Sequence, residues 1–232
     1  MQLASVTRAD LKGAELSKTS LKGTILQGAN FTDARLTGTD LSNADLRGTV
    51  FTRAILNSAE LSQANFSRAK LNDADLSSAT MTASDFSEAE LIRANLSGGK
   101  LVRALFRAAT LRNARLNGAN LNGASFWKAN LSEADLSGAN LNNADLSDAD
   151  LTEVNLTDSY LMRAKLGKAN LTDAKLLRTQ LVGADLKETK LCGADLTEAN
   201  LKEAYLKGAD LRRAKLKTSK GITTLQLAEA NS

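Results

Sequence analysis

An apolar residue returns at every fifth position from Val6 to Leu216, and this unbroken period restricts the fold more than any other feature. These forty-three central residues, each denoted i, follow one another without an insertion, and all but eight are Leu. Position i−2 is Ala in most units and another small residue in nearly all others. The pattern is most regular at residues 129–151, which read ANLSEADLSGANLNNADLSDADL. A repeat this regular predicts a repetitive architecture.

A period of five fits neither an α-helix, which repeats every 3.6 residues, nor a long strand, which repeats every two. It fits a short strand that turns a corner every five residues, with i−2 and i pointing inward and i−1 pointing outward. Positions i+1 and i+2 are mostly polar residues or Gly, as exposed turns require. One unit buries its apolar side chains only by stacking on others, so the sequence predicts a solenoid. Gly99 lacks the i−2 methyl group and is the expected weak point of the core.

The spacing of the Phe residues indicates how many units form one coil. Two groups of Phe residues recur at intervals of twenty, namely Phe66, Phe86, Phe106 and Phe126, and Phe31 with Phe51. Four units per coil would stack each group as a column, whereas three units would scatter most of them. Opposite charges recur at the same spacing, as at Asp195 and Lys215, and Asn120 with Asn140 would form a short ladder. The sequence therefore predicts a four-sided coil of twenty residues.

The phrase Ala-Asp/Asn-Leu-x-x resembles the repeat of the pentapeptide repeat family, and the match extends from residue 4 to about residue 218. The resemblance implies an all-β fold, a right-handed quadrilateral parallel β-helix of about eleven coils with i and i−2 inside. Many members of this family come from cyanobacteria and plant chloroplasts, and many have no known activity. The resemblance thus implies a fold and leaves the function open.

The repeat ends after Leu216, which divides the chain into a β-helix at residues 1–218 and a C-terminal turn with a capping helix at 219–232. Thr223 and Gln226 have the spacing of a capping box, and Ile222 with Leu227 has that of a hydrophobic staple. We expect a short helix at 224–230 that covers the last coil, because an open solenoid end is an unpaired β edge. The N-terminal end shows no comparable cap. There we expect either a longer natural chain or end-to-end self-association through the N-terminal coil.

Catalytic chemistry has little support in the sequence. The chain has no His, so it lacks an imidazole base and an imidazole metal ligand. Its carboxylates fall almost entirely at the outward positions i−1 and i+2, and Cys192 has no His partner to activate it. No phosphate-binding loop and no C-x-x-C pair occurs. We expect a protein that is not an enzyme and has no catalytic, cofactor-binding or metal site.

The expected location follows from the same composition. No run of about 18 apolar residues is present, and the N-terminus lacks the apolar core of a signal peptide. A single Cys is compatible with a reducing compartment. We expect a cytoplasmic protein without a membrane span, or one of the thylakoid lumen or periplasm if a targeting segment was removed.

Charges are segregated along the chain in two belts. From Ile92 to Ser132 every charge is basic, and from Glu133 to Asp158 every charge is acidic. One interpretation is drift on a surface that needs only to be polar. The other is complementarity to a partner, or staggered self-association of one belt against the opposite belt. Arg103, Arg107 and Arg112 are the candidate binding residues of the basic belt.

Large apolar residues at outward positions are the second sign of an interface. Trp127 is the chain's only Trp, and Leu105 lies on the same expected face one coil earlier. Tyr160, Met162 and Val182 would cluster on another face. An exposed Trp on a polar rod is typical of an interface anchor, although scattered apolar surface residues are also normal. We take these five residues as candidate protein-binding residues.

These observations favour a non-catalytic scaffold that offers rigid flat faces to an unknown protein partner. The alternative is a DNA mimic acting on a type II topoisomerase, gyrase, because gyrase-protecting pentapeptide proteins are similar in fold. Those mimics are strongly acidic, whereas this chain has a net charge of +4 and a basic belt. Direct nucleic-acid binding is disfavoured, because the basic belt has no interleaved aromatic residues beyond Trp127.

Overall fold

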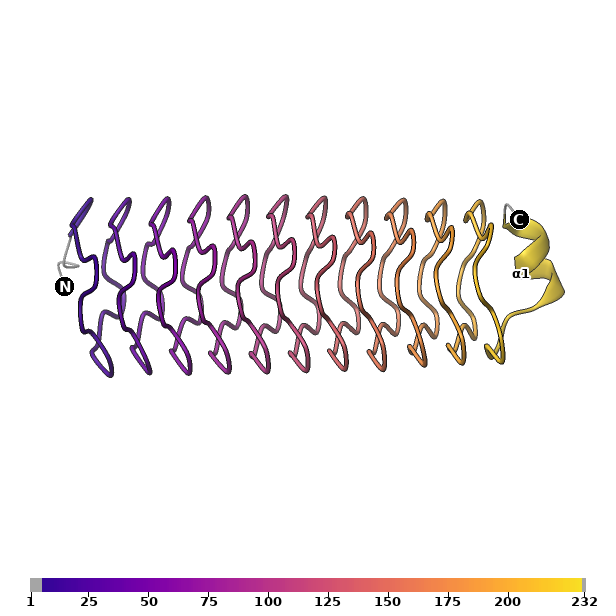
Figure 1. Ribbon diagram of the computed structural model, residues 1–232, viewed down its shortest axis with the longest axis horizontal. Helices are drawn as coiled ribbons and strands as arrows, with labels where there is room; N and C mark the ends of the chain where they lie inside the picture. The colour runs from indigo at the N-terminus through magenta and orange to yellow at the C-terminus, as the bar shows by residue number, and fades with distance from the viewer. Residues whose placement is uncertain (1–5, 231–232) are drawn as a thin grey trace.

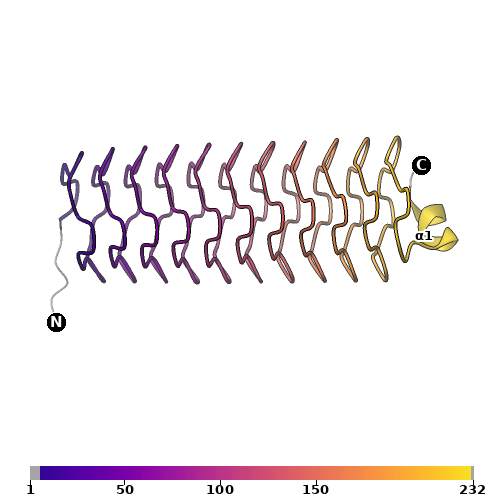
Figure 2. The ribbon, with the colours of Figure 1, turned by 60° about the horizontal axis from the view of Figure 1, so that its bottom comes forward.

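The protein forms an almost straight rod of stacked coils with a short helix at one end (Figure 1). The computed structural model describes residues 6–230, and Figure 2 shows the same stack turned about its long axis. Among these residues the only helix is α1, Thr224–Glu229, which lies at the far end of the rod from Val6. The β structure consists of isolated parallel bridges, one residue on each side of each coil.

Every bridge joins two i−1 residues twenty positions apart, from Asp10 with Asn30 to Asn200 with Lys220. Four units therefore make one coil, as the Phe spacing predicted. Within the ladder, the N–H groups of i and i+2 donate to the following coil and the N–H of i−1 donates to the preceding one. The chain is a right-handed, four-sided parallel β-helix.

The core is a continuous column of mainly Leu and Ala that is fully buried from Leu26 to Ala209, whereas Ala214 and Leu216 in the last coil are partly buried. Leu11, Leu16 and Leu21, in the first coil, are only partly buried. The Phe columns form as predicted: consecutive rings within each column lie 4.7–5.0 Å apart between centroids and within 13° of parallel. Phe51 and Phe66 join the two columns at 5.7 Å with a 54° tilt. The interior thus repeats coil after coil.

Gly99 is not the gap in the core that its sequence position suggested. A Cβ at Gly99 would lie 3.0 Å from the terminal methyl carbon of Met81 and 3.0 Å from the Leu96 carbonyl oxygen. Met81 is the only Met among the central residues, and its long side chain fills the space that the absent methyl group leaves. The two irregularities therefore compensate each other.

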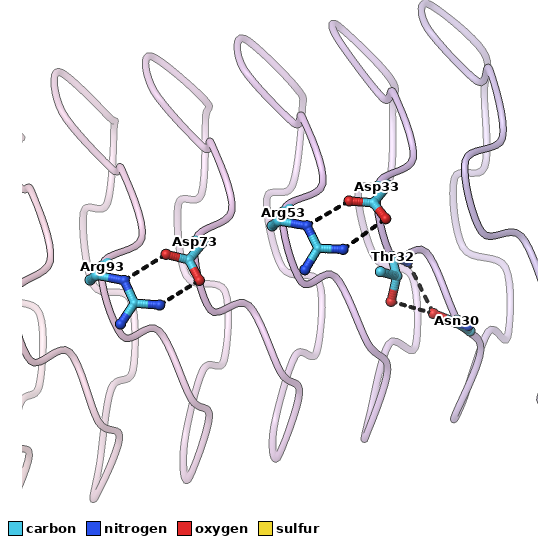
Figure 3. A network of polar contacts seen from close by, with 6 residues as sticks. All are labelled: Asn30, Thr32, Asp33, Arg53, Asp73 and Arg93. Atoms are coloured by element: carbon cyan, nitrogen blue, oxygen red, sulfur yellow. Dashed lines mark hydrogen bonds and ion pairs between the residues drawn. The ribbon is translucent and has the colours of Figure 1, made fainter.

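The turns explain two sequence preferences. Every i+2 residue from Arg8 to Thr218 has a left-handed backbone, with φ between 53° and 72°, and twelve of the fifteen Gly occupy this position. Asp and Asn are the commonest i−1 residues because their side-chain oxygen accepts the N–H of i+1, as Asn30 does from Thr32 at 3.0 Å (Figure 3). Asn120 and Asn140 bind their own turns in this way. The expected hydrogen bond between the Asn120 and Asn140 side chains does not form in this described segment.

Helix α1 closes the last coil. Thr223 and Gln226 form the predicted capping box, and the helix ends at Glu229, one residue earlier than predicted. The Gln226 side-chain nitrogen donates to the Ala204 carbonyl at 2.6 Å, and Gly208 N–H donates to the Glu229 carbonyl at 2.8 Å. These are backbone groups that a further coil would otherwise pair.

Of the proposed staple, Ile222 packs against the core, whereas Leu227 is 37% exposed. The N-terminal end of the rod is less covered, since Val6 is 43% exposed. Residues 1–5, which form part of the expected end-to-end contact, lie outside the described residues.

Candidate interaction surfaces

The described residues show no constellation for catalysis or metal binding. None of their Cys, Asp and Glu side chains form a group of three that could hold a metal ion. Cys192 is half-buried in a turn and unbridged. No helix in this part of the chain is long and apolar enough to cross a membrane.

Ion pairs are concentrated towards the two ends of the rod. Arg53 binds Asp33 in the preceding coil through two bonds of 2.8 Å, and Arg93 binds Asp73 through two of 2.7 Å (Figure 3). Hydrogen bonding by these guanidinium groups holds the pKa of both carboxyls below the usual range. Near the C-terminal end, Lys215 pairs with Asp195 at 3.5 Å, as their twenty-residue spacing predicted.

The middle of the rod differs, because none of the ion pairs in the described structure involves residues 94–157. Arg115 and Asp135 are bridge partners, yet they too form no ion pair. This segment contains most of the basic belt and of the acidic belt. No opposite charge within the described chain neutralises the charges of this segment, although acids such as Asp135 and Asp145 accept hydrogen bonds from their own turns.

The basic belt is mainly a ring around a single coil. Apart from Arg93, which pairs with Asp73 in the preceding coil, its cations lie on all four sides of that coil, at Lys100, Arg103, Arg107, Arg112 and Arg115, with Lys128 in the next coil. The acidic belt covers only three sides, because the face centred on Asn120 and Asn140 carries no charge between residues 118 and 123 or between 138 and 143. The belts thus have a sidedness that the linear sequence did not reveal.

We define the Trp127 face by the bridge residues Ile25 to Tyr205 at intervals of twenty and the turn residues that follow each. Trp127 is 41% exposed there, and the Lys128 ammonium lies 4.5 Å from its ring centre. Leu105 is half-buried and pairs with Ser125 in the ladder. Arg107 occupies the position of Trp127 one coil earlier.

The structure gathers most of the candidate residues of this region on the Trp127 face, but not all. Arg103 lies at the turn before Leu105, with its aliphatic stem over Gly123 of the next coil. Arg112 lies one corner further round the coil, so it is outside this face.

The Tyr160 face, defined by the bridge residues Ser20 to Lys220 and their following turns, holds the second predicted cluster. Tyr160 and Met162 are 48% and 41% exposed, and the half-buried Val182 stacks one coil beyond Met162. Two shallow hollows flank this cluster and share Asn142, whose side-chain oxygen accepts the Met162 N–H at 2.8 Å. Gly118 and Gly138 form the floor beside Tyr160. The result is an uncharged strip of amides that ends in apolar side chains, with Arg163 lining the same hollow as Met162 and Val182.

Sequence reasoning missed Tyr205, which is 57% exposed on the Trp127 face with the Lys187 ammonium 5.2 Å from its ring centre. The signal was present, since Tyr205 is a large residue at an outward i−1 position, as Leu105 is. It also missed the uncharged strip, because five Asn residues spread over two coils look ordinary in a linear sequence.

Two family models match the chain. One, described as pentapeptide repeats, matches residues 4–43, 29–68, 129–167, 139–177 and 179–217. The other, described as a pentapeptide repeat region, matches residues 49–126. A search among curated proteins returns no match.

Several solved structures are similar. HetL, a pentapeptide repeat protein involved in heterocyst differentiation regulation from the cyanobacterium Nostoc sp. strain PCC 7120, is 31% identical over 94% of this chain and 89% of its own, with a TM-score of 0.32. A pentapeptide repeat protein of the Arabidopsis thaliana thylakoid lumen is 39% identical over 41% of this chain and 63% of its own, with a TM-score of 0.32. A trypsin-treated variant of QnrB1, a plasmid-mediated fluoroquinolone resistance protein, is 19% identical over 97% of this chain and 92% of its own, with a TM-score of 0.46.

Proposed function

The chain belongs to the pentapeptide repeat family, and from that premise we propose that it is a non-catalytic scaffold presenting rigid flat faces to a protein partner. The observation that carries the proposal is the Tyr160 face. There Tyr160, Met162 and Val182 form an exposed apolar cluster beside a strip of uncharged amides. Exposed aromatic and Met side chains are the residue types that anchor protein interfaces.

The rigidity of the wall behind the cluster supports the same function. Leu161 and Leu181 are fully buried beneath the cluster, and the turns on either side are held by backbone bonds of 2.7–3.1 Å. A preformed surface loses little conformational entropy on binding, so modest contact area can give useful affinity. Asn140 and Asn142 add donors and acceptors whose spacing the coil fixes.

Quantitative affinity capture tests this proposal. The variant carries Tyr160→Ser and Met162→Ser, and Ser occupies the same two repeat positions elsewhere, at Ser125 and Ser147, so the coil should form normally. The matched control is Tyr205→Ser, which removes an equally exposed ring from another face. We expect a bound protein that the control retains and the double variant loses by about tenfold or more. If the wild type and the double variant capture the same proteins equally, the Tyr160 face is not the binding surface.

A DNA mimic acting on gyrase is the second candidate. It is supported by the acids of residues 133–158, which cover three sides of the rod as phosphates would. The ring of cations one coil earlier opposes it, because it would repel a site built for DNA. A supercoiling assay with gyrase and a quinolone tests this second candidate. Protection of gyrase at micromolar protein supports DNA mimicry, and the absence of any effect contradicts it.

For location we propose the cytoplasm, with the thylakoid lumen or periplasm as alternatives. The support is Cys192, which is unbridged and compatible with a reducing compartment. Cell fractionation with an antibody against the native protein distinguishes the compartments, and recovery outside the cytoplasm would contradict the first choice.

A further inference from the structure

On the Trp127 face, rows of residues at equal distances before and after Trp127 carry net charges of opposite sign. Each row of this face consists of a bridge residue and the residues two and three positions after it. The row one coil before Trp127 carries Arg107 alone, and the row one coil after it carries Asp145 and Asp148. These two rows are therefore +1 and −2, at equal distances from Trp127.

The next rows outward continue the order. Two coils before Trp127 the row carries Asp85 and Glu88, and two coils after it the row carries Lys165 and Lys168. Their charges are −2 and +2. An acidic row on one side thus again corresponds to a basic row on the other.

The third rows follow the same rule. Three coils before Trp127 the row carries Arg68, and three coils after it the row carries Asp185, Lys187 and Glu188, which sum to −1. The three rows on each side of Trp127 are therefore complementary to each other in reverse order, over a length of roughly 30 Å at strand spacing, while the central row carries Lys128 and would face its own copy.

From this order we propose that the protein self-associates as an antiparallel dimer through the Trp127 face. A twofold axis that passes beside Trp127, perpendicular to the rod and in the plane of the interface, would place each row against the row of opposite charge. Such an interface is isologous, so every contact forms twice. Trp127 of one copy then meets Trp127 of the second copy at the centre, and Arg107 meets Asp148.

The central groups are suited to this role. Arg107 and Asp148 are exposed, and neither forms an ion pair or side-chain hydrogen bond within the described chain. Trp127 is a large exposed ring at the centre, where interface anchors contribute most. Phe106 and Phe126 stack directly behind it at 4.9 Å, which keeps the wall regular. Equal coil spacing in both copies brings all seven rows into register together.

The outer rows do not oppose the arrangement. Arg68 already pairs with Glu88, but their side chains are 74% and 56% exposed, so the pair is weakly held and free to rearrange. The two Lys128 ammonium groups would lie near the twofold axis, each beside its own Trp127 ring. Asp148 of the second copy lies only one coil away from each of them.

The first test measures association of the full chain by sedimentation equilibrium and by tryptophan fluorescence. Because Trp127 is the only Trp, its emission reports directly on the proposed axis. We expect dimers and a concentration-dependent emission change at about 0.05 M salt, and monomers at about 0.5 M salt. A chain that stays monomeric up to about 100 μM at low salt overturns the proposal.

The second test uses Arg107→Glu and Asp148→Arg. Arg occupies the i+2 position of Asp148 elsewhere, as at Arg53, so the coil tolerates it. Each single variant should self-associate about tenfold more weakly than the wild type. An equimolar mixture of the two should regain wild-type affinity as a heterodimer, because Glu then meets Arg in one contact and Asp148 meets Arg107 in the other.

Two further variants complete this test. Trp127→Ala should weaken association, and Arg112→Glu, which reverses an exposed cation of the same coil outside the face, should not. Single variants that associate like the wild type, or a mixture that regains nothing, overturn the proposal. Dimers insensitive to Trp127→Ala would use another surface, such as the N-terminal coil, and overturn it as well.

Discussion

One corner of the rod carries two successive runs of four residues with the same backbone and very different charges. At the same left-handed turn position, with φ between 55° and 60°, the first run is Asp33, Arg53, Asp73 and Arg93, and the second is Asn113, Glu133, Glu153 and Asp173. The first run alternates in sign and binds itself in bidentate pairs, whereas the second places acids above acids. Like charges facing each other across strands are destabilising.

This difference shows that the repeat determines the position of each side chain but not the residue with which it pairs. In the first run the chain satisfies its own charges. In the second run the same positions hold charges that the chain does not neutralise, next to Asp148 and the Trp127 face. A surface in this state is suited to binding another molecule. The two runs differ in charge alone only if the core and the turns behind them contribute equally to stability.

The largest effect should come from Gly99→Ala. The added methyl group would lie 3.0 Å from both the Met81 side chain and the Leu96 carbonyl, so it overpacks the core. We expect a loss of about 1–3 kcal/mol in the free energy of unfolding, measured by chemical denaturation. Met81→Leu alone should cost less than about 1.5 kcal/mol, because it leaves a small gap.

The double variant is the decisive member of this cycle. Combining Gly99→Ala with Met81→Leu restores the sequence pattern of the other units, so its stability should return close to that of the wild type. Additive losses in the double variant would show that Met81 does not fill the space beside Gly99.

Substitutions at the left-handed turn positions should have the next largest effect on stability, and the effect should not depend on the charges nearby. Ala108 has φ of 53° without the freedom of Gly, so Ala108→Gly should raise stability by about 0.5–1 kcal/mol. Gly118→Ala is the matched reverse, because a Cβ there meets nothing within 4 Å and introduces only backbone strain. It should lower stability by about 1 kcal/mol in the same denaturation experiment. A stable Gly118→Ala variant would mean that the turn does not require a left-handed residue.

The sequence predicted the parts of the structure that the period determines. Twenty residues per coil followed from the Phe spacing, and the final helix followed from Thr223 and Gln226. It predicted the location of Trp127 and Tyr160 on outer faces for the same reason. What it could not show depends on side-chain conformation and on neighbours one coil away. Met81 reaching across to Gly99 is one such case.

The surface was harder to predict than the core. The twenty-residue register could have revealed that the cations form a ring and that the Asn120 strip is uncharged, but only after the chain was wound into columns. Ion pairing could not be deduced even then. Arg115 and Asp135 are bridge partners without an ion pair, while Arg53 and Asp33 pair between adjacent coils at the same corner, because rotamers decide which long side chains meet.

Restoring the alternation of charge sign in the second, acidic run should give a smaller gain in stability. Glu153→Arg places a cation between Glu133 and Asp173, as Arg53 stands between Asp33 and Asp73. We expect about 0.5–1 kcal/mol of added stability at low salt, because an exposed pair gains little and a like-charge repulsion disappears. Arg53→Glu should lose a similar amount. Thermal melting at low and high salt measures both, and a gain that persists at about 0.5 M salt would not be electrostatic.

The smallest effect on stability concerns Asp45, a bridge residue in the N-terminal half of the rod that already has a basic partner within the chain. Hydrogen bonds from Arg47 at 2.8 and 2.7 Å, outweighing partial burial and aided by Gln27, lower the pKa of Asp45 to about 2. Because this folded pKa lies below the unfolded value of about 3.9, the pair stabilises the fold fully above about pH 4, and that contribution is lost as the pH falls through about 2.

Arg47 is half-exposed, so solvent screening keeps the contribution of the pair small. Asp45→Asn should therefore melt below the wild type at neutral pH and converge with it near pH 2. Arg47→Gln keeps the carboxyl but removes the main cause of the shift, and Gln27 shows that Gln suits this turn position. It should lose most of the same pH dependence. A difference in melting temperature between wild type and Asp45→Asn that stays constant from pH 7 to pH 2 would show that packing, not charge, accounts for the contribution of Asp45.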